Sequence, residues 1–238
     1  MQHKTKEDFM TVIESSKDTC FEHIVRTRRS VRGFLDKPVP QETLKQVFEL
    51  AQWSPSNCNI QPWLVYVASG ETRDNIRQEI VDAIMGGVPQ NPDYDYPGKF
   101  EGEYRTRQVE CAVAMYNEMG IARDDSAGRM KAMLRNFELF DAPHVCFIGM
   151  HKSFGTTVAI DVGMYVQTLM LAMTAHGIGS CAQGSMRYYP DIVRKTFDLS
   201  DDVHILCGIS FGYEDPEVPA NRTRTTRVPL TENITFKD

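Results

Sequence analysis

Apolar residues recur at helical spacing over much of this chain, and shorter apolar runs bounded by turn residues lie between those stretches. The helical spacing predicts helices over residues 19–27, 41–53, 72–85, 104–120, 126–140, 156–176 and 191–197. The short runs predict strands over residues 63–68, 144–150 and 203–211. Because helical stretches separate these strands, the pattern is typical of a mixed α and β fold.

The composition is that of one large globular domain. The 238 residues include 42% hydrophobic and 24% charged residues, which is enough apolar material for a single buried core over residues 1–238. Residues 1–10 form a polar tail. Residues 86–104 are rich in turn formers and aromatic residues, and periodic segments flank them, so we expect a long functional loop there.

Charge and hydropathy argue against nucleic-acid and membrane partners. The net charge is -6, whereas a general nucleic-acid binder needs a broad basic face. Residues 1–8 lack the apolar segment of a secretory signal. The most apolar stretch, residues 158–175, contains Asp161 and Gln167, which favours a buried core helix over a membrane helix.

The cysteines and histidines show no metal-ligand or disulfide spacing. The 6 cysteines are scattered without a Cys-x-x-Cys pair, a pattern that suits thiols in a reducing cytoplasm. The 6 histidines form no His-x-x-x-His arrangement, so no metal site is predicted. No serine or cysteine has a recognisable nucleophile motif around it, which suggests that a bound cofactor performs the chemistry.

Two groups of arginines lie far apart in this acidic sequence. They are Arg28, Arg29 and Arg32, with Ser30 among them, and Arg222, Arg224 and Arg227. A guanidinium group matches phosphate oxygens two at a time, and a serine hydroxyl adds another donor, so a phosphorylated ligand between the groups is one hypothesis. The alternative is a pair of solvated basic turns, because the sequence does not show that the groups meet.

Side-chain amides are concentrated in the loop after the second predicted helix. Asn57, Asn59 and Gln61 each offer a donor and an acceptor, as the edge of a heteroaromatic ring requires. Asparagine is also common in loops for its turn geometry, so a purely structural role stays open. Gln183 and Gly184 form a second candidate, because glycine lets backbone N–H groups approach a flat ligand closely.

Residues 177–182 satisfy a Gly-x-Gly-x-x-Ala pattern, which in other proteins binds a dinucleotide. That fingerprint works only where it leaves a strand and opens a helix, and here it follows a predicted helix. We therefore interpret Gly177 and Gly179 as a helix end followed by close backbone packing.

Taken in order, several motifs resemble the FMN-dependent nitroreductase superfamily over nearly the whole chain. They are residues 27–34 with Pro38 and Pro40, residues 51–63, residues 177–184 and residues 221–230. The middle segments, at residues 104–107, 136–137 and 142–144, resemble the branch that acts on nitrobenzoates and dinitroanilines. The resemblance implies an α+β fold with a central, mainly antiparallel sheet flanked by helices.

The resemblance also implies an intertwined homodimer that holds FMN in two clefts at the subunit interface. The C-terminal extension, residues 213–238, would be exchanged onto the partner, where Ile234 to Phe236 would add a strand. The implied cofactor-binding residues are Arg28, Arg29, Ser30, Arg32, Arg224 and Arg227 at the phosphate, Asn59 with Pro55, Ser56 and Asn57 at the flavin ring, and Gln183 and Gly184 near flavin N5.

The implied reaction is a ping-pong transfer of electrons from NADH or NADPH to an electron-poor aromatic, without a catalytic side chain. Tyr94, Tyr96 and Tyr104 are the substrate-facing candidates, although each could equally belong to an ordinary surface loop. A reductive dehalogenase of the same fold is the alternative, with Lys99 and Glu101 joining Tyr104 at the substrate. A quinone or enone reductase, or a non-catalytic flavin-binding module, also stays open.

Overall fold

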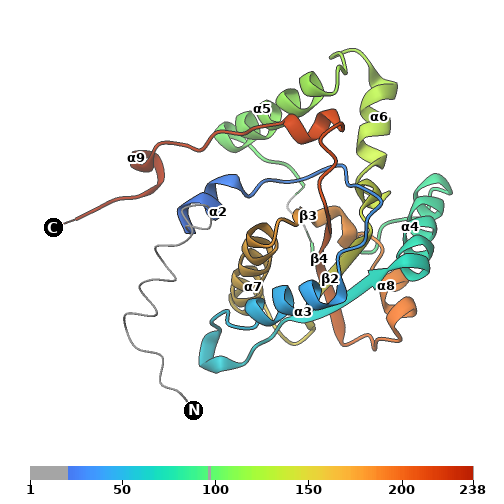
Figure 1. Ribbon diagram of the computed structural model, residues 1–238, viewed down its shortest axis with the longest axis vertical. Helices are drawn as coiled ribbons and strands as arrows, with labels where there is room; N and C mark the ends of the chain where they lie inside the picture. The colour runs from blue at the N-terminus through green and yellow to red at the C-terminus, as the bar shows by residue number, and fades with distance from the viewer. Residues whose placement is uncertain (1–20, 96–97, 238) are drawn as a thin grey trace.

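The computed structural model describes residues 21–95 and 98–237, and its centre is an antiparallel sheet (Figure 1). The strands are β1 (Leu64–Ser69), β2 (His144–His151), β3 (Gly179–Gln183) and β4 (Val203–Gly212), in the order β1-β2-β4-β3. Every neighbouring pair is antiparallel. The predicted α+β class and the three predicted strands are confirmed.

Helices account for about half of the remaining described chain. They are α2 (Phe21–Thr27), α3 (Gln41–Ala51), α4 (Gly70–Met85), α5 (Gly102–Glu118), α6 (Ser126–Leu134), α7 (Thr156–Ala175), α8 (Pro190–Phe197) and α9 (Leu230–Asn233). Four short 3-10 turns join them: η2 (Asn57–Asn59), η3 (Leu139–Asp141), η4 (Gly184–Arg187) and η5 (Pro219–Arg222). Most predicted helices agree within a few residues.

The helix predicted over residues 126–140 is wrong at its C-terminal end. Asp125 caps α6 by accepting a 2.8 Å hydrogen bond from the Gly128 backbone, but the helix ends at Leu134. Leu139, Phe140 and Asp141 have φ angles of 57°, 54° and 62°, which no right-handed helix contains. Leu139 and Phe140 continue the apolar helical pattern in the sequence, but a tight turn and not a helix buries them.

Strand β3 was not predicted, because its sequence Gly-Ser-Cys-Ala-Gln has low strand propensity. Its ladder with β4 supplies the missing stabilisation. The prediction of close backbone packing is confirmed at Gly179, where an added Cβ would lie 2.8 Å from the Val31 side chain. Ser30 pairs with Ser180 in a parallel bridge, so the first arginine segment packs directly on β3.

The sheet separates two apolar cores. On one face, Cys146, Ile148 and Met150 of β2 pack with α3 and α7. On the other face, Val145 and Phe147 of the same strand pack with α4 and α8. Alternate residues of β2 therefore point into different cores, which explains why the strand is apolar at nearly every position. Figure 1 shows α3 and α7 on one side and α4 and α8 on the other.

Within the described chain, α7 is the one helix long and apolar enough to cross a membrane, with a mean hydropathy of 1.4. It packs as a core helix, with Val162, Tyr165 and Leu169 buried against the sheet. Only 33% of its most apolar window is buried, however, and Ile160 is 61% exposed. An apolar helix surface therefore remains uncovered in the single chain.

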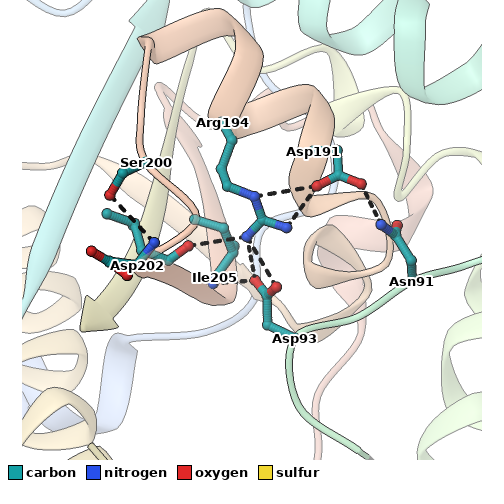
Figure 2. A network of polar contacts seen from close by, with 8 residues as sticks. Asn91, Asp93, Asp191, Arg194, Ser200, Asp202 and Ile205 are labelled. Carbon is teal, nitrogen blue, oxygen red and sulfur yellow. Dashed lines mark hydrogen bonds and ion pairs between the residues drawn. The ribbon is translucent and has the colours of Figure 1, made fainter. Parts of the chain in front are cut away.

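A polar network fixes the segment that follows α4 (Figure 2). The Arg194 guanidinium of α8 lies 2.9 Å from both carboxylate oxygens of Asp93, and Asp93 also accepts a 2.7 Å bond from the Ile205 amide of β4. Asp191 contacts both Arg194 and Asn91. The first part of the 86–104 loop is thus attached to the body of the protein.

His144, the first residue of β2, is buried and held in its neutral form. Its Nε2 accepts a 2.9 Å hydrogen bond from the Val39 amide, and its Nδ1 contacts the Ser69 hydroxyl. Burial, and secondarily the positive charge of Arg73, lower the pKa of His144. A protonated ring would set an N–H against the Val39 N–H, so acid disfavours this arrangement.

We expect His144 to make the protein less stable in mild acid. Its folded-state pKa lies below the usual 6.5, so its contribution is fully present above that pH and is lost as the pH falls through the folded pKa. One proton contributes at most about 1.4 kcal/mol per pH unit. Urea unfolding at several pH values would measure this slope. The His144→Gln variant keeps an acceptor for Val39 and should have a shallower slope; equal slopes would contradict the assignment.

Candidate functional site

The two arginine groups converge in the structure. Arg28 follows the C-terminal end of α2, and Arg227 lies in the segment between η5 and α9. Arg28 is half-buried; burial first, and then repulsion from Arg227, lower the pKa of its guanidinium. Two cations separated by almost 200 residues in sequence therefore lie close enough to repel each other, an arrangement that suits an anion between them.

Cys181 of β3 marks the centre of the first arginine group. Burial raises the pKa of its thiol, while Arg32, a hydrogen bond from Ser30, and Arg28 act in the opposite direction. These three predicted residues therefore surround one point on β3. The parallel bridge between Ser30 and Ser180 holds them there.

A cavity of about 210 Å³ lies beside this group, between the arginine segment, β3 and the C-terminal end of α7. Arg28, Arg29 and Ser180 line it. The Ser180 residue is 2% exposed, and its hydroxyl has no hydrogen-bond partner. A buried donor without a partner is costly, so a ligand oxygen or water is the expected partner for this hydroxyl.

Arg29 contacts Glu214 in a half-buried ion pair. Its guanidinium is therefore attached to the chain that follows β4, where Glu214 also pairs with Phe34 in an antiparallel bridge. Arg32, which also acts on Cys181, lines a small cavity of about 110 Å³ together with Arg135 and Phe140. The four predicted phosphate-side residues of the first segment thus have different surroundings.

The second arginine group is more exposed than the first. Arg222 pairs with Glu118 at the end of α5, and Arg224 donates a 2.8 Å hydrogen bond to the Asn221 carbonyl. Arg224 and Arg227 line a groove of about 580 Å³ between this segment and α5. Figure 1 shows the segment running beside α5 before it extends away from the sheet.

The amide-rich loop lies at the other end of α7. Asn57 donates its backbone N–H to buried Asp161 over 3.1 Å, and the Gln61 amide donates to the Ser56 hydroxyl over 2.9 Å. Pro55, Asn57 and Asn59 are exposed. Asp161 and Thr174 lie 13 helical positions apart on α7, about 20 Å along its axis. A single chain therefore holds this loop well away from the cavity at Arg28.

The side chain of Gln183 is hydrogen-bonded within the chain and links β3 to neighbouring segments. Its side chain donates to the Asn136 carbonyl over 2.6 Å and accepts from the Ser210 hydroxyl, and the residue is 3% exposed. The nitrogen and the oxygen of its amide therefore each have a partner within the chain. Gly184 begins η4 and is exposed, and its carbonyl accepts a 2.9 Å hydrogen bond from Arg187.

The two predicted tyrosines among the described residues, Tyr94 and Tyr104, have different surroundings. Tyr94 packs on the core beside His204, with ring centroids 5.2 Å apart, and its buried hydroxyl has no partner. Tyr104 is 71% exposed on α5, where Arg107 lies 5.7 Å from its ring. Tyr96 lies outside the described residues. The role of all three in substrate binding stays a prediction.

Two residues of the site were not singled out by the sequence. Ser180 lies within the quoted motif 177–184, but only the ladder of β3 reveals that its hydroxyl is buried at the cavity. Asn221 begins the motif 221–230 and is buried between both arginine segments. Among residues 21–95 and 98–237, no three histidine, cysteine or acidic side chains are placed to hold a metal ion.

Known proteins share this sequence and fold. The chain is 38% identical over 218 residues to the nitroreductase NfnB of Mycolicibacterium smegmatis, which covers 90% of this chain and 92% of that protein. It is 34% identical to a chloronitrobenzene nitroreductase of Comamonas testosteroni over 216 residues, covering 90% of this chain and 95% of that protein.

The fold of this chain is also similar to solved nitroreductase structures. The FMN-dependent nitroreductase NfnB of Mycobacterium smegmatis, crystallised with NADPH, superposes with a TM-score of 0.87 at 38% identity over 91% of this chain and 97% of that one. An FMN- and NADPH-dependent NfnB from Sphigopyxis sp. strain HMH gives a TM-score of 0.88 at 35% identity, over 92% and 99% of the two chains. Residues 25–213 match the nitroreductase family, and this chain belongs to it.

Proposed function

We propose that this protein is an FMN-dependent oxidoreductase that takes electrons from NADPH or NADH and reduces nitroaromatic compounds. The observation that carries the proposal is the position of Arg28, which interacts with Arg227 and lines a cavity with a buried, unpartnered Ser180 hydroxyl. Such a set of cationic and hydroxyl donors fits the phosphate of FMN. Bound flavin would supply the chemistry, since it accepts hydride and passes electrons on.

The residues of this chain would hold and orient the cofactor. Arg28, Ser30 and Arg227 would bind the phosphate, with Arg32 and Arg224 at its periphery. Because Arg29 pairs with Glu214, we assign it mainly to fixing the segment. The exposed backbone at Gly184 would face the reactive edge of the ring, and the internal bonds of Gln183 would keep that backbone rigid.

A homodimer would complete the site. The amide-rich loop with Pro55, Ser56, Asn57 and Asn59 is exposed and about 20 Å along α7 from the arginines, so a second copy could bring its loop to the flavin. The uncovered apolar surface of α7 and the 88% exposed Trp53 support such an interface. The extension 213–238 would lie on the partner, and a monomeric mass in solution would contradict the dimer.

The acceptor would enter near the loop 86–104. A groove of about 450 Å³ lies beside Gly184 and is lined by Val88, Phe137 and Tyr188 among others. Such apolar and aromatic walls suit a flat ring. The relatives named for chloronitrobenzene, and for 4-nitrobenzoate in Nocardioides, point to a nitroaromatic acceptor.

We further propose that residues 1–238 form one flavin-binding domain that works in the cytoplasm. Both apolar cores share the same sheet, which is consistent with one folding unit. The described cysteines, which are Cys58, Cys111, Cys146, Cys181 and Cys207, are free thiols, as a reducing compartment favours.

The purified protein is expected to be yellow and to bleach when NADPH is added without oxygen. Adding 4-nitrobenzoate should then restore the yellow colour as the acceptor takes the electrons. Stopped-flow absorbance of the two half-reactions would measure both steps. A flavin that NADPH and NADH leave oxidised would contradict the enzyme and favour a binding module, whereas turnover of iodotyrosine in place of nitrobenzoate would favour a dehalogenase.

A further inference from the structure

The side chain of Asn221 joins the two chain segments that carry the phosphate-binding arginines. Asn221 lies in η5 and is 3% exposed. Its Oδ1 accepts a 2.7 Å hydrogen bond from the Arg32 backbone N–H. Its Nδ2 donates to the carbonyls of Gly33 and Asp215, over 2.8 Å in each case.

The polarity of these partners fixes the orientation of the amide. The backbone N–H of Arg32 needs an acceptor, and the carbonyls of Gly33 and Asp215 need donors, so a reversed amide would lose every one of these bonds. Only a side-chain amide offers this combination at this length. If the amide were removed, the Arg32 N–H would lose its acceptor, whereas the Gly33 and Asp215 carbonyls would keep only the bonds from the backbone N–H groups of Asp215 and Val218.

Asn221 also holds the second arginine segment through its own backbone. Its carbonyl accepts a 2.8 Å hydrogen bond from the Arg224 guanidinium, and its N–H donates to the Val218 carbonyl over 3.0 Å. At Gly33 an added Cβ would lie 2.5 Å from the Val218 side chain, so the two segments are in direct contact. One residue therefore sets the spacing between residues 28–33 and residues 221–227.

We propose that Asn221 is a positioning residue that holds the Arg28 and Arg227 sides of the phosphate site in register; this inference rests on the proposed function. In this role Asn221 would act without contacting the cofactor itself. It acts by fixing the backbone from which each arginine extends, so that both guanidinium groups reach the same phosphate. Asn221 would therefore strengthen binding of the dianionic phosphate and not of the flavin ring.

The test compares FMN with riboflavin, which lacks the phosphate. Fluorescence titration of apoprotein should show that the wild type prefers FMN, and that Asn221→Ala and Asn221→Asp reduce this preference by about tenfold or more. Asp keeps the acceptor for Arg32 but loses both donors. Riboflavin affinity should change little. An unchanged FMN-to-riboflavin ratio in folded variants would overturn the proposal.

Val193→Ala is the matched control for lost stability. Val193 is fully buried in the other core, on α8, so its truncation lowers the melting temperature without touching the phosphate site. Its FMN-to-riboflavin ratio should equal that of the wild type. A wild type without preference for FMN would instead reject the phosphate site and the proposed function along with it.

Hydrogen exchange on the wild type decides the question if the Asn221 variants do not fold. FMN should slow exchange of the Arg32 amide, which bonds to Asn221, more than riboflavin does at equal saturation. Equal protection by both ligands would show that the phosphate does not act through this junction.

Discussion

Arg28→Ala is expected to yield a protein that is purified with little or no flavin. The variant loses a half-buried cation that repels Arg227, and a phosphate between them would attract both guanidinium groups and offset this repulsion. A charged hydrogen bond of this kind contributes on the order of 1.5 to 3 kcal/mol, or roughly a 10- to 150-fold change in affinity. The absorbance ratio of flavin to protein, and the Kd for added FMN, would measure the effect.

Arg26→Ala is the matched control, because Arg26 lies two residues away on α2. Its side chain is 76% exposed and pairs with Glu22 one helical turn earlier. Removing such a surface pair changes stability by about 0 to 1 kcal/mol and should leave flavin content unchanged. Arg227→Ala should behave like Arg28→Ala. Full flavin content in both Arg28 and Arg227 variants would exclude this phosphate site.

The arginine groups were visible in the sequence, but their approach was not. Helical and strand periodicity predicted most elements, since amphipathic spacing is a local property. The meeting of Arg28 and Arg227 depends on where β3 and the segment after β4 lie in space. It is set by contacts between distant residues, such as the bridge between Ser30 and Ser180, and no local pattern encodes it.

The errors of the sequence interpretation share a physical cause. Strand β3 consists of small and polar residues, and only pairing with β4 makes it a strand. The end of α6 was missed because Leu139 and Phe140 continue a helical apolar pattern while adopting left-handed φ angles. In both places the surrounding structure overrides local propensity. The buried role of Asn221 was hidden for the same reason.

Asp93→Ala is expected to cause the largest loss of stability among the predicted variants. The side chains of Asp93 and Arg194 are 8% and 12% exposed, and Asp93 also accepts from the Ile205 amide (Figure 2). Removing one partner of a buried ion pair costs about 3 to 5 kcal/mol, and here Arg194 would keep only the exposed carboxylate of Asp191 as a charged partner. The melting temperature should fall by roughly 6 to 20 °C.

The neighbouring ion pair of Lys195 and Glu79 is the matched control, because it carries the same charges on the surface. Lys195 is 72% exposed and pairs with Glu79, so Lys195→Ala should change stability by about 0 to 1 kcal/mol. Because Asp93 also attaches the loop 86–104 to α8 and β4, Asp93→Ala should raise the KM for the nitroaromatic acceptor in the protein that remains folded. Equal losses of stability in the two variants would show that Asp93 and Arg194 contribute no more than a surface pair.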